Sequence, residues 1–287
     1  MKILVTGAEG LLGSEFMDLG RSAGHEMVGA GRSALDVTDS QAVKSALGDG
    51  GFEWVIHCAA FTAVDAAESE PEAAFRVNER GAENVARSAA DTGARMVYIS
   101  TDYVFDGNSA RPYRVDDAPL PLSVYGKSKL AGERAVQRSL GGDGGREPHF
   151  LVVRTGWLYG SGGSNFVTTM LRLAREGRPL RVVEDQVGRP TWGRNVARAT
   201  IRLMELGAVG LMHVADEGTA SWLEFAREAI RLEGLESNVT GVSTAAWGAA
   251  APRPASSILD LSRVAETLGT PMMHWQEALA KYLRELR

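Results

Sequence analysis

The stretch KILVTGAEGLLG, residues 2–13, decides the fold of this chain. Its first five residues form a continuous β-rich apolar run, which is typical of a strand buried on both faces of a parallel sheet. Glycines follow at positions 7, 10 and 13, and an amphipathic segment from about Leu12 to Ala23 predicts a helix. Such glycines permit a tight turn, let the backbone approach a pyrophosphate and let the helix pack on the strand. The stretch therefore predicts a dinucleotide site at a helix amino terminus.

Short apolar runs continue to alternate with helix-length segments through the first half of the chain. Strands are predicted at residues 26–30, 54–58, 95–100 and 150–154, and helices at 41–47, 72–92 and 125–140. This alternation indicates right-handed βαβ units. The sequence therefore predicts an α/β fold with a doubly wound parallel sheet of the Rossmann type. The glycine-rich stretch 141–145 is predicted to be a surface loop.

Beyond Gly156 the regular alternation of strands and helices ends. Helices are predicted at residues 166–176, 195–206, 221–231 and 275–286, and a strand at 211–214. Ser221 and Glu224 have the spacing of a capping box. We expect an NAD(P)-binding Rossmann domain over 1–156, with a segment of about 190–215 packing back onto it. Residues 157–287 should form a smaller α/β substrate-binding lobe over the carboxyl ends of the strands, where ligands of open α/β sheets bind.

Composition restricts the classes of partner. The formal net charge is −5 and the pI is about 5.7, so no basic excess indicates nucleic-acid binding. No stretch approaches the roughly 20 apolar residues of a membrane span, and the residues after Met1 do not resemble a signal peptide. The one cysteine, Cys58, suits a reducing compartment and is expected to be buried. We expect a cytoplasmic protein.

The end of the second predicted strand bears on the choice of dinucleotide. Residues 29–32 read GAGR and lack the acidic residue that usually binds the ribose hydroxyls of NAD. Arg32 can instead pair with a 2′-phosphate, which favours NADPH, with NADH still possible. The alternative is a solvated surface arginine. Asp36 is a more distant acidic candidate, expected near the adenine.

Tyr125 and Lys129 provide a pattern for proton transfer. They lie four residues apart on a predicted helix and so share one face. A free tyrosine has a pKa of about 10, and a neighbouring ammonium should lower it towards the working range. Lys129 can also bind the nicotinamide ribose. Thr101, at the end of the strand 95–100, can polarise the carbonyl that Tyr125 protonates. The alternative is a surface tyrosine and lysine.

Five blocks of sequence extend this pattern into a family resemblance. They are AAFTAVD with AESEPE (59–65 and 67–72), STDYVFDG (100–107), PLSVYGKSKLAGE (121–133), RTGWLY (154–159) and DQVGRPT (185–191). With them the chain resembles the extended short-chain dehydrogenase/reductases, and within these the dTDP-4-dehydrorhamnose reductases, over nearly its whole length.

The resemblance implies NAD(P)H-dependent reduction of the 4-keto group of a dTDP-4-keto-6-deoxy-hexose, dTDP-4-dehydrorhamnose to dTDP-L-rhamnose, in deoxysugar and cell-surface polysaccharide biosynthesis. The partner would be this dTDP-linked sugar, and the protein a monomer or homodimer. Together with the motifs above it predicts three groups of residues. The catalytic residues are Thr101, Tyr125 and Lys129. The cofactor-binding residues are Gly7, Gly10, Leu11, Leu12, Gly13, Arg32, Asp36, Val37, Ala60, Phe61, Thr62, Ile99, Tyr125 and Lys129. The substrate-binding residues are Val64, Thr101, Asp102, Tyr103, Trp157 and Arg253.

Two departures from the family pattern concern ligands. Its R-P-x-N-S motif reads RPASS at residues 253–257, so Ser256 replaces an asparagine expected near the nucleotide diphosphate. Some members form a magnesium-linked dimer through glutamates. Glu15 matches one such position, but another is Arg194, so no metal site is predicted.

Two alternatives stay open. A related nucleotide-sugar 4-epimerase would use the same residues but retain its cofactor and return the hydride. A non-catalytic regulatory subunit, resembling that of methionine adenosyltransferase, would bind a dinucleotide and a partner chain. The intact set of Thr101, Tyr125 and Lys129 argues against the second.

Overall fold

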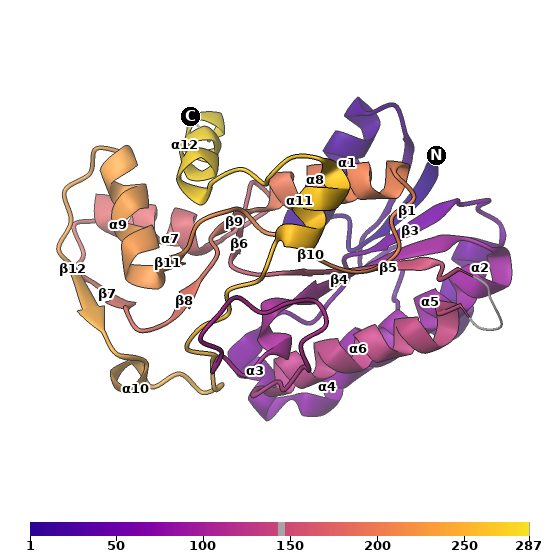
Figure 1. The fold of residues 1–287 in the computed structure, drawn as a ribbon, viewed down its shortest axis with the longest axis horizontal. Coiled ribbons are helices and arrows are strands. Elements are labelled where there is room, and N and C mark those ends of the chain that lie inside the picture. The colour runs from indigo at the N-terminus through magenta and orange to yellow at the C-terminus, as the bar shows by residue number, and fades with distance from the viewer. Residues whose placement is uncertain (143–146, 287) are drawn as a thin grey trace.

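The computed structural model describes residues 1–142 and 147–286 (Figure 1). Its centre is a parallel sheet of six strands. In spatial order the strands are β10 (Gly210–His213), β5 (Phe150–Thr155), β4 (Arg95–Thr101), β3 (Trp54–His57), β1 (Lys2–Thr6) and β2 (Glu26–Ala30). Each neighbouring pair is parallel. The predicted doubly wound parallel sheet is confirmed.

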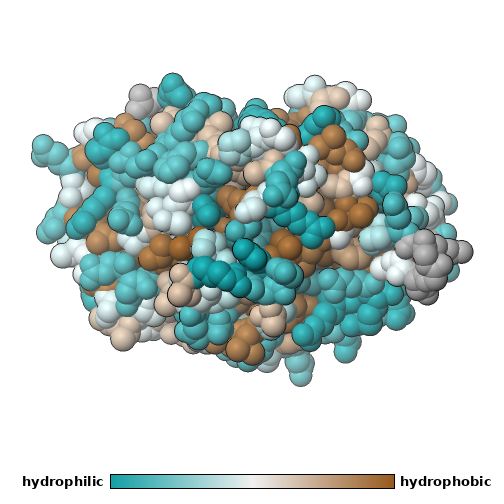
Figure 2. Space-filling model, in the orientation of Figure 1, coloured by the Kyte–Doolittle hydropathy of each residue, from teal (hydrophilic) through white to brown (hydrophobic). Residues whose placement is uncertain are grey.

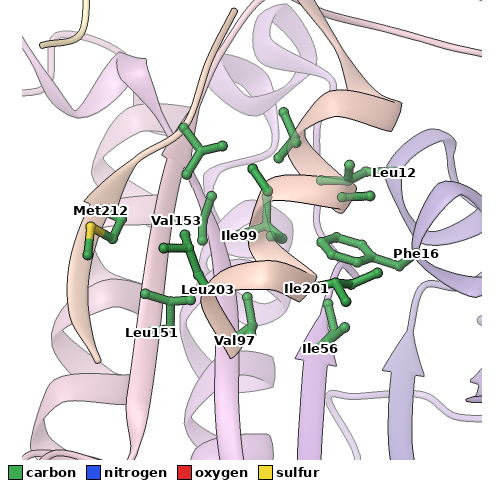
Figure 3. Close-up of a cluster of buried hydrophobic side chains, with 14 of the residues drawn as sticks. Leu12, Phe16, Ile56, Val97, Ile99, Leu151, Val153, Ile201, Leu203 and Met212 are labelled. Carbon is green, nitrogen blue, oxygen red and sulfur yellow. The ribbon is translucent and has the colours of Figure 1, made fainter. Parts of the chain in front are cut away.

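Helices cover both faces of this sheet. Alternate residues of each strand point to opposite sides and so enter two separate clusters. Val97 of β4 and Leu151 of β5 belong to one cluster, shared with α1 (Leu11–Ser22), α8 (Gly193–Glu205) and α11 (Ser262–Leu268). Figure 3 shows strand side chains directed at α8, with Phe16 of α1 beside them. The opposite cluster is shared with α2 (Ser40–Gly48), α5 (Ala82–Thr92) and α6 (Val124–Leu140).

The outermost strand, β10, comes from the second half of the chain. It pairs with β5, from Gly210 opposite Leu151 to His213 opposite Arg154. The helix before it, α8, packs against α1. The sheet is therefore completed by residues that follow a long excursion away from it.

A smaller group of elements lies to the left in Figure 1. Its helices are α7 (Phe166–Arg175), α9 (Trp222–Leu232), α10 (Thr244–Trp247) and α12 (Trp275–Glu285). Its strand pairs are β7 (Leu180–Val183) with β12 (Val239–Val242), β8 (Val187–Gly188) with β11 (Ala220–Ser221), and β6 (Leu158–Tyr159) with β9 (Thr191–Trp192). A third hydrophobic cluster fills it. The capping box of Ser221 and Glu224 is confirmed at the start of α9.

The predicted helix over 72–92 has a more complex course. It consists of α4 (Pro71–Phe75), a π-helical turn (Arg76–Gly81) and α5. A separate short helix, α3 (Val64–Ser69), precedes it, and a 3₁₀ turn (Asp102–Val104) follows β4. Pro71 separates α3 from α4 because proline is best accommodated in a first helical turn. Of the predicted loop 141–145, residues 143–145 lie outside the described residues.

Hydrophilic residues cover most of the face drawn in Figure 2, and the hydrophobic residues that reach it form small separate patches. Within residues 1–142 and 147–286, no helix is both long and apolar enough to span a membrane.

Candidate active site

The glycine loop connects β1 to α1 and is tightly packed. Gly7 has a φ of 65°, which favours glycine, and a Cβ there would lie 2.7 Å from the backbone nitrogen of Ala59. A Cβ at Gly13 would lie 2.2 Å from the carbonyl oxygen of Gly7. The N-cap of α1 is Gly10, which has no side chain to cap the first N–H groups. These donors are open to an anion, as a pyrophosphate site requires. Leu11 and Leu12 form the first turn.

Arg32 and Asp36 follow β2 on the surface. Asp36 accepts hydrogen bonds from the backbone and hydroxyl of Thr38, at 2.9 and 2.8 Å, and these bonds lower the pKa of its carboxyl. The charge of Arg32 acts in the same direction. Val37 is 5% exposed and packs in the core, so only its backbone can reach a ligand. Ile99 likewise lies in the core, beneath the end of β4.

The loop after β3 is held by a residue that the sequence reasoning missed. Asn78, on the π-helical turn, accepts from the backbone N–H of Phe61 at 2.8 Å and donates to the Phe61 carbonyl at 3.1 Å. It also donates to the Ser128 hydroxyl on α6 at 2.9 Å. Asn78 therefore fixes the predicted cofactor-binding segment Ala60–Thr62 against the helix that carries Tyr125. The Arg-Val-Asn motif carries no local signal of this role.

Thr101 and Tyr125 meet where β4 ends and α6 begins. Ser123 caps α6 by accepting from the N–H of Gly126, which sets Tyr125 in the first turn. The Thr101 hydroxyl donates to Asp102 at 3.1 Å and accepts from the N–H of Tyr103 at 3.2 Å. Lys129 follows one turn after Tyr125, is 2% exposed, and its Nζ lies 4.2 Å from the centre of the Tyr98 ring. The structure thus brings Thr101 and Tyr125 into contact, while the ammonium of Lys129 lies over Tyr98.

The expected lowering of the Tyr125 pKa is wrong for this structure. Burial raises the pKa of Tyr125 to about 12, and a hydrogen bond with Thr101 only partly opposes this rise. The ammonium of Lys129 lies over the ring of Tyr98 and does not offset the effect of burial on Tyr125. Burial also lowers the pKa of Lys129 to about 7, opposed by the charge of Glu133.

Glu133 belongs to a buried group that the motif reading did not anticipate. It lies one turn beyond Lys129 on α6 and is 1% exposed. Arg154 of β5 donates to both of its oxygens, at 2.9 and 2.7 Å, and the Ser100 hydroxyl donates at 2.5 Å. This hydrogen-bonded pair joins β4, β5 and α6 next to the predicted catalytic residues.

The residues predicted to bind the sugar lie on the other side of Thr101. Burial raises the pKa of Asp102 to about 6, and the hydroxyls of Ser257 and Thr101 oppose this rise. The Tyr103 ring meets the Tyr125 ring edge to face, with 5.9 Å between centroids.

Arg253 forms an ion pair within the protein. It donates to both carboxylate oxygens of Asp65, at 3.0 and 2.7 Å, next to the predicted residue Val64 at the start of α3. It also hydrogen-bonds Tyr103. Ser256 uses its N–H to reach the Gly107 carbonyl at 3.3 Å. Arg253 and Tyr103 therefore connect the C-terminal segment to α3 and to the end of β4.

Trp157 has a left-handed backbone, with a φ of 53°, which is uncommon for a bulky residue. Its indole Nε1 donates to the Ser257 hydroxyl at 3.3 Å. A Cβ at Gly188 would lie 2.3 Å from the same indole. Trp157 is therefore held from several sides beside the Asp102 carboxylate, which lies against Gly156.

The guanidinium of Arg194 lies beside Glu15, the position at which some relatives are expected to bind magnesium. Arg194 lies 3.5 Å from Glu15 and 3.6 Å from Glu285. Among residues 1–142 and 147–286, no group of three or more His, Cys, Asp or Glu side chains is placed to hold a metal ion. Cys58 is half-buried, and burial raises the pKa of its thiol to about 12.

Comparison with known proteins identifies the family. The model of the RmlD substrate binding domain matches residues 1–287. The spore coat polysaccharide biosynthesis protein SpsK of Bacillus subtilis is 40% identical, over 99% of this chain and 97% of its own length. The dTDP-4-dehydrorhamnose reductase of Streptomyces griseus is 42% identical, over 97% of this chain and 91% of its own length. The crystal structure of the dTDP-4-dehydrorhamnose reductase of Bacillus anthracis in complex with NADP superposes with a TM-score of 0.94 at 36% identity, over 99% of each chain. The chain belongs to the RmlD substrate binding domain family, the family of dTDP-4-dehydrorhamnose reductases.

Proposed function

We propose that this chain uses NADPH to reduce the 4-keto group of a dTDP-4-keto-6-deoxy-hexose, converting dTDP-4-dehydrorhamnose to dTDP-L-rhamnose. The observation that carries this proposal is the meeting of Thr101 and Tyr125 at the carboxyl edge of the sheet, on the same edge as the open amino terminus of α1. The relative from Streptomyces griseus is named for this reaction, and the relative from Bacillus anthracis holds NADP.

Tyr125 is the proton donor in this proposal. A pKa of about 12 keeps its hydroxyl protonated at neutral pH, so a proton is available when negative charge develops on the sugar oxygen. NADPH, when bound, supplies the hydride. The Thr101 hydroxyl, which donates to Asp102 in this structure, would turn to donate a hydrogen bond to the same sugar oxygen and so stabilise the transition state. Lys129, one helical turn further along α6, is assigned to the nicotinamide ribose, because its ammonium lies over the Tyr98 ring in this structure.

Arg253 suits the diphosphate of a dTDP-sugar, because guanidinium groups bind phosphate oxygens through paired hydrogen bonds. Its present partner, Asp65, is half exposed, so a diphosphate would compete with that carboxylate for Arg253. Asp102, Tyr103 and Trp157 then lie between the diphosphate and the reacting carbon, where the sugar ring is expected.

We assign dinucleotide binding to residues 1–156 together with about 190–215, which contribute β10 and α8 to the sheet side of the molecule. Sugar binding is assigned to 157–287. The enzyme is expected to act in the cytoplasm as a monomer or homodimer, without a nucleic-acid partner.

The test is Tyr125→Phe, assayed by NADPH oxidation with dTDP-4-dehydrorhamnose and by NMR of the product. We expect a loss of turnover of about 10²- to 10⁴-fold, the usual contribution of a positioned acid, with NADP⁺ affinity unchanged. Tyr113→Phe is the matched control, since the Tyr113 hydroxyl bonds Asp106 away from Thr101. Undiminished turnover in Tyr125→Phe would contradict the mechanism. Interconversion of C4 epimers without net NADPH oxidation would instead identify an epimerase.

A further inference from the structure

A carboxylate lies at the carboxyl end of β2, although the residues that end this strand are not acidic. It belongs to Glu9, in the loop between β1 and α1. A Cβ built on Gly31, the residue after β2, would lie 2.3 Å from the Glu9 Cδ and Oε1 atoms and 2.6 Å from Oε2. The Glu9 carboxylate therefore occupies the space that the Cβ of any other residue at position 31 would need. Glycine at position 31 leaves this space to Glu9.

This place in the fold has a defined role in dinucleotide binding. An acidic residue at the end of the second strand accepts hydrogen bonds from the ribose hydroxyls of NAD, and an arginine nearby accommodates the 2′-phosphate of NADP. The glycine loop beside it fits a pyrophosphate, because a Cβ at Gly7 or Gly13 would clash with backbone atoms and Gly10 leaves the α1 amino terminus open.

The charges at this corner are mixed. Glu9 is exposed and carries one negative charge, and Arg32 is exposed and carries one positive charge. The charges of Arg32 and Arg76 both act on Asp36, whose carboxylate is bonded to Thr38. Asp36 is thus turned towards its own loop, and Glu9 is the carboxylate packed against the strand end.

We propose that Glu9 supplies the carboxylate that β2 lacks, so that the chain accepts NADH as well as NADPH and Glu9 limits the preference for NADPH. The carboxylate accepts hydrogen bonds from the 2′- and 3′-hydroxyls of NADH. The Glu9 carboxylate repels the 2′-phosphate of NADPH, whereas the Arg32 guanidinium attracts that phosphate. This inference rests on the proposed function only in that a nicotinamide dinucleotide binds at the glycine loop.

The experiment measures the dissociation constants of NAD⁺ and NADP⁺ for the purified full chain by titration calorimetry. In Glu9→Gln we expect the ratio of NADP⁺ affinity to NAD⁺ affinity to rise on the order of tenfold, the size of one lost charge repulsion near a surface. Gly31→Ala should shift the ratio in the same direction, because its Cβ displaces the Glu9 carboxylate without changing the net charge. Its φ lies outside the left-handed region, so alanine is tolerated.

Glu26→Gln is the matched control. It neutralises a carboxylate at the opposite end of β2, paired with Lys2 at 3.3 Å, and should leave the ratio unchanged. An unchanged or lowered ratio in Glu9→Gln overturns this inference while leaving the reductase proposal intact. If the wild-type chain binds neither nucleotide, both proposals fail. If the ratio shifts as expected but no keto-sugar is reduced, only the proposed reaction fails.

Discussion

The indole rings of Trp157 and Trp222 are stacked face to face, with 3.6 Å between their centroids and 3° between their planes. Trp157 follows β5, and Trp222 is the first residue of α9. The stack stabilises a bulky residue in a left-handed conformation that costs about 1–3 kcal/mol elsewhere. It also connects the smaller group of elements to the residue expected to line the sugar site.

Removing this stack should affect sugar binding selectively. In Trp222→Leu the KM for the dTDP-sugar should rise up to about tenfold, because an aromatic pair contributes about 0.5–1.5 kcal/mol. NADP⁺ affinity should stay constant, and the exciton signal of the paired indoles in circular dichroism should disappear. Trp247→Leu is the control, since Trp247 is 52% exposed on α10. An unaltered KM in Trp222→Leu would refute a positioning role.

Glu133 should determine how much of Lys129 is charged. Glu133→Gln removes the anion that opposes the effect of burial, so the pKa of Lys129 should fall below its present value of about 7. The groups around Lys129 are His57 at the end of β3, Cys58 directly after that strand, Tyr98 and Glu133. The measurement is a ¹³Cε NMR titration, which is well suited to a chain whose lysines are Lys2, Lys44, Lys127, Lys129 and Lys281.

Two further variants make this titration decisive. Glu133→Asp keeps the charge and should keep the Lys129 midpoint near that of the wild type. The double variant Glu133→Gln/Arg154→Gln removes the buried cation that the single variant leaves unpaired, a change that otherwise costs about 3–5 kcal/mol. The Lys129 midpoint should still be lowered in the double variant. A wild-type midpoint there would assign the effect to Arg154 instead.

Asp216 should make stability fall as the pH rises. Burial raises the pKa of its carboxyl from 3.8 to about 7, although the N–H of Trp192 and the amide of Asn195 donate to it. Between these two values the folded chain holds a proton that the unfolded chain has lost, so each rise in pH favours unfolding. The slope for one group is at most about 1.4 kcal/mol per pH unit.

Asp216→Asn cannot ionise, so its stability relative to the wild type should improve from pH 4 to pH 7, as measured by urea unfolding. Asp185→Asn is a control of opposite sign, because hydrogen bonds from Thr244 lower the pKa of Asp185 and stabilise the fold above its ordinary pKa of 3.8. A pH-independent difference for Asp216→Asn would show that Asp216 is ionised throughout.

The strands and most helices were predictable because their signals are local. The inner strands of the sheet are buried on both faces, which matches the apolar runs within Lys2–Thr6 and Arg95–Thr101. That Tyr125 and Lys129 share one face of α6 follows from helical spacing alone, and the contact of Tyr125 with Thr101 follows from the parallel arrangement of β4 and its neighbours.

The parts that were missed depend on partners distant in sequence. The π-helical turn forms where Asn78 bonds Phe61, 17 residues earlier, and Ser128, 50 residues later. The spacing of apolar residues along the helix does not predict these hydrogen bonds. The pKa of Tyr125 was misjudged for the same reason, because its burial by distant segments raises the pKa and the Lys129 ammonium lies over Tyr98 of β4 instead.

The origin of β10 has a consequence for recombination between relatives. This strand begins at Gly210, 55 residues after β5 ends at Thr155, yet it covers the edge of β5. A chimera joined at residue 156 would import a foreign β10 and α8 together with the foreign sugar-binding residues. Any mismatch would leave the β5 edge open to pairing with other chains, which promotes aggregation. Exchange of sugar specificity therefore calls for grafting segments 157–189, 216–261 and 269–287, while residues 190–215 and α11, which packs on α8 and β10, stay native.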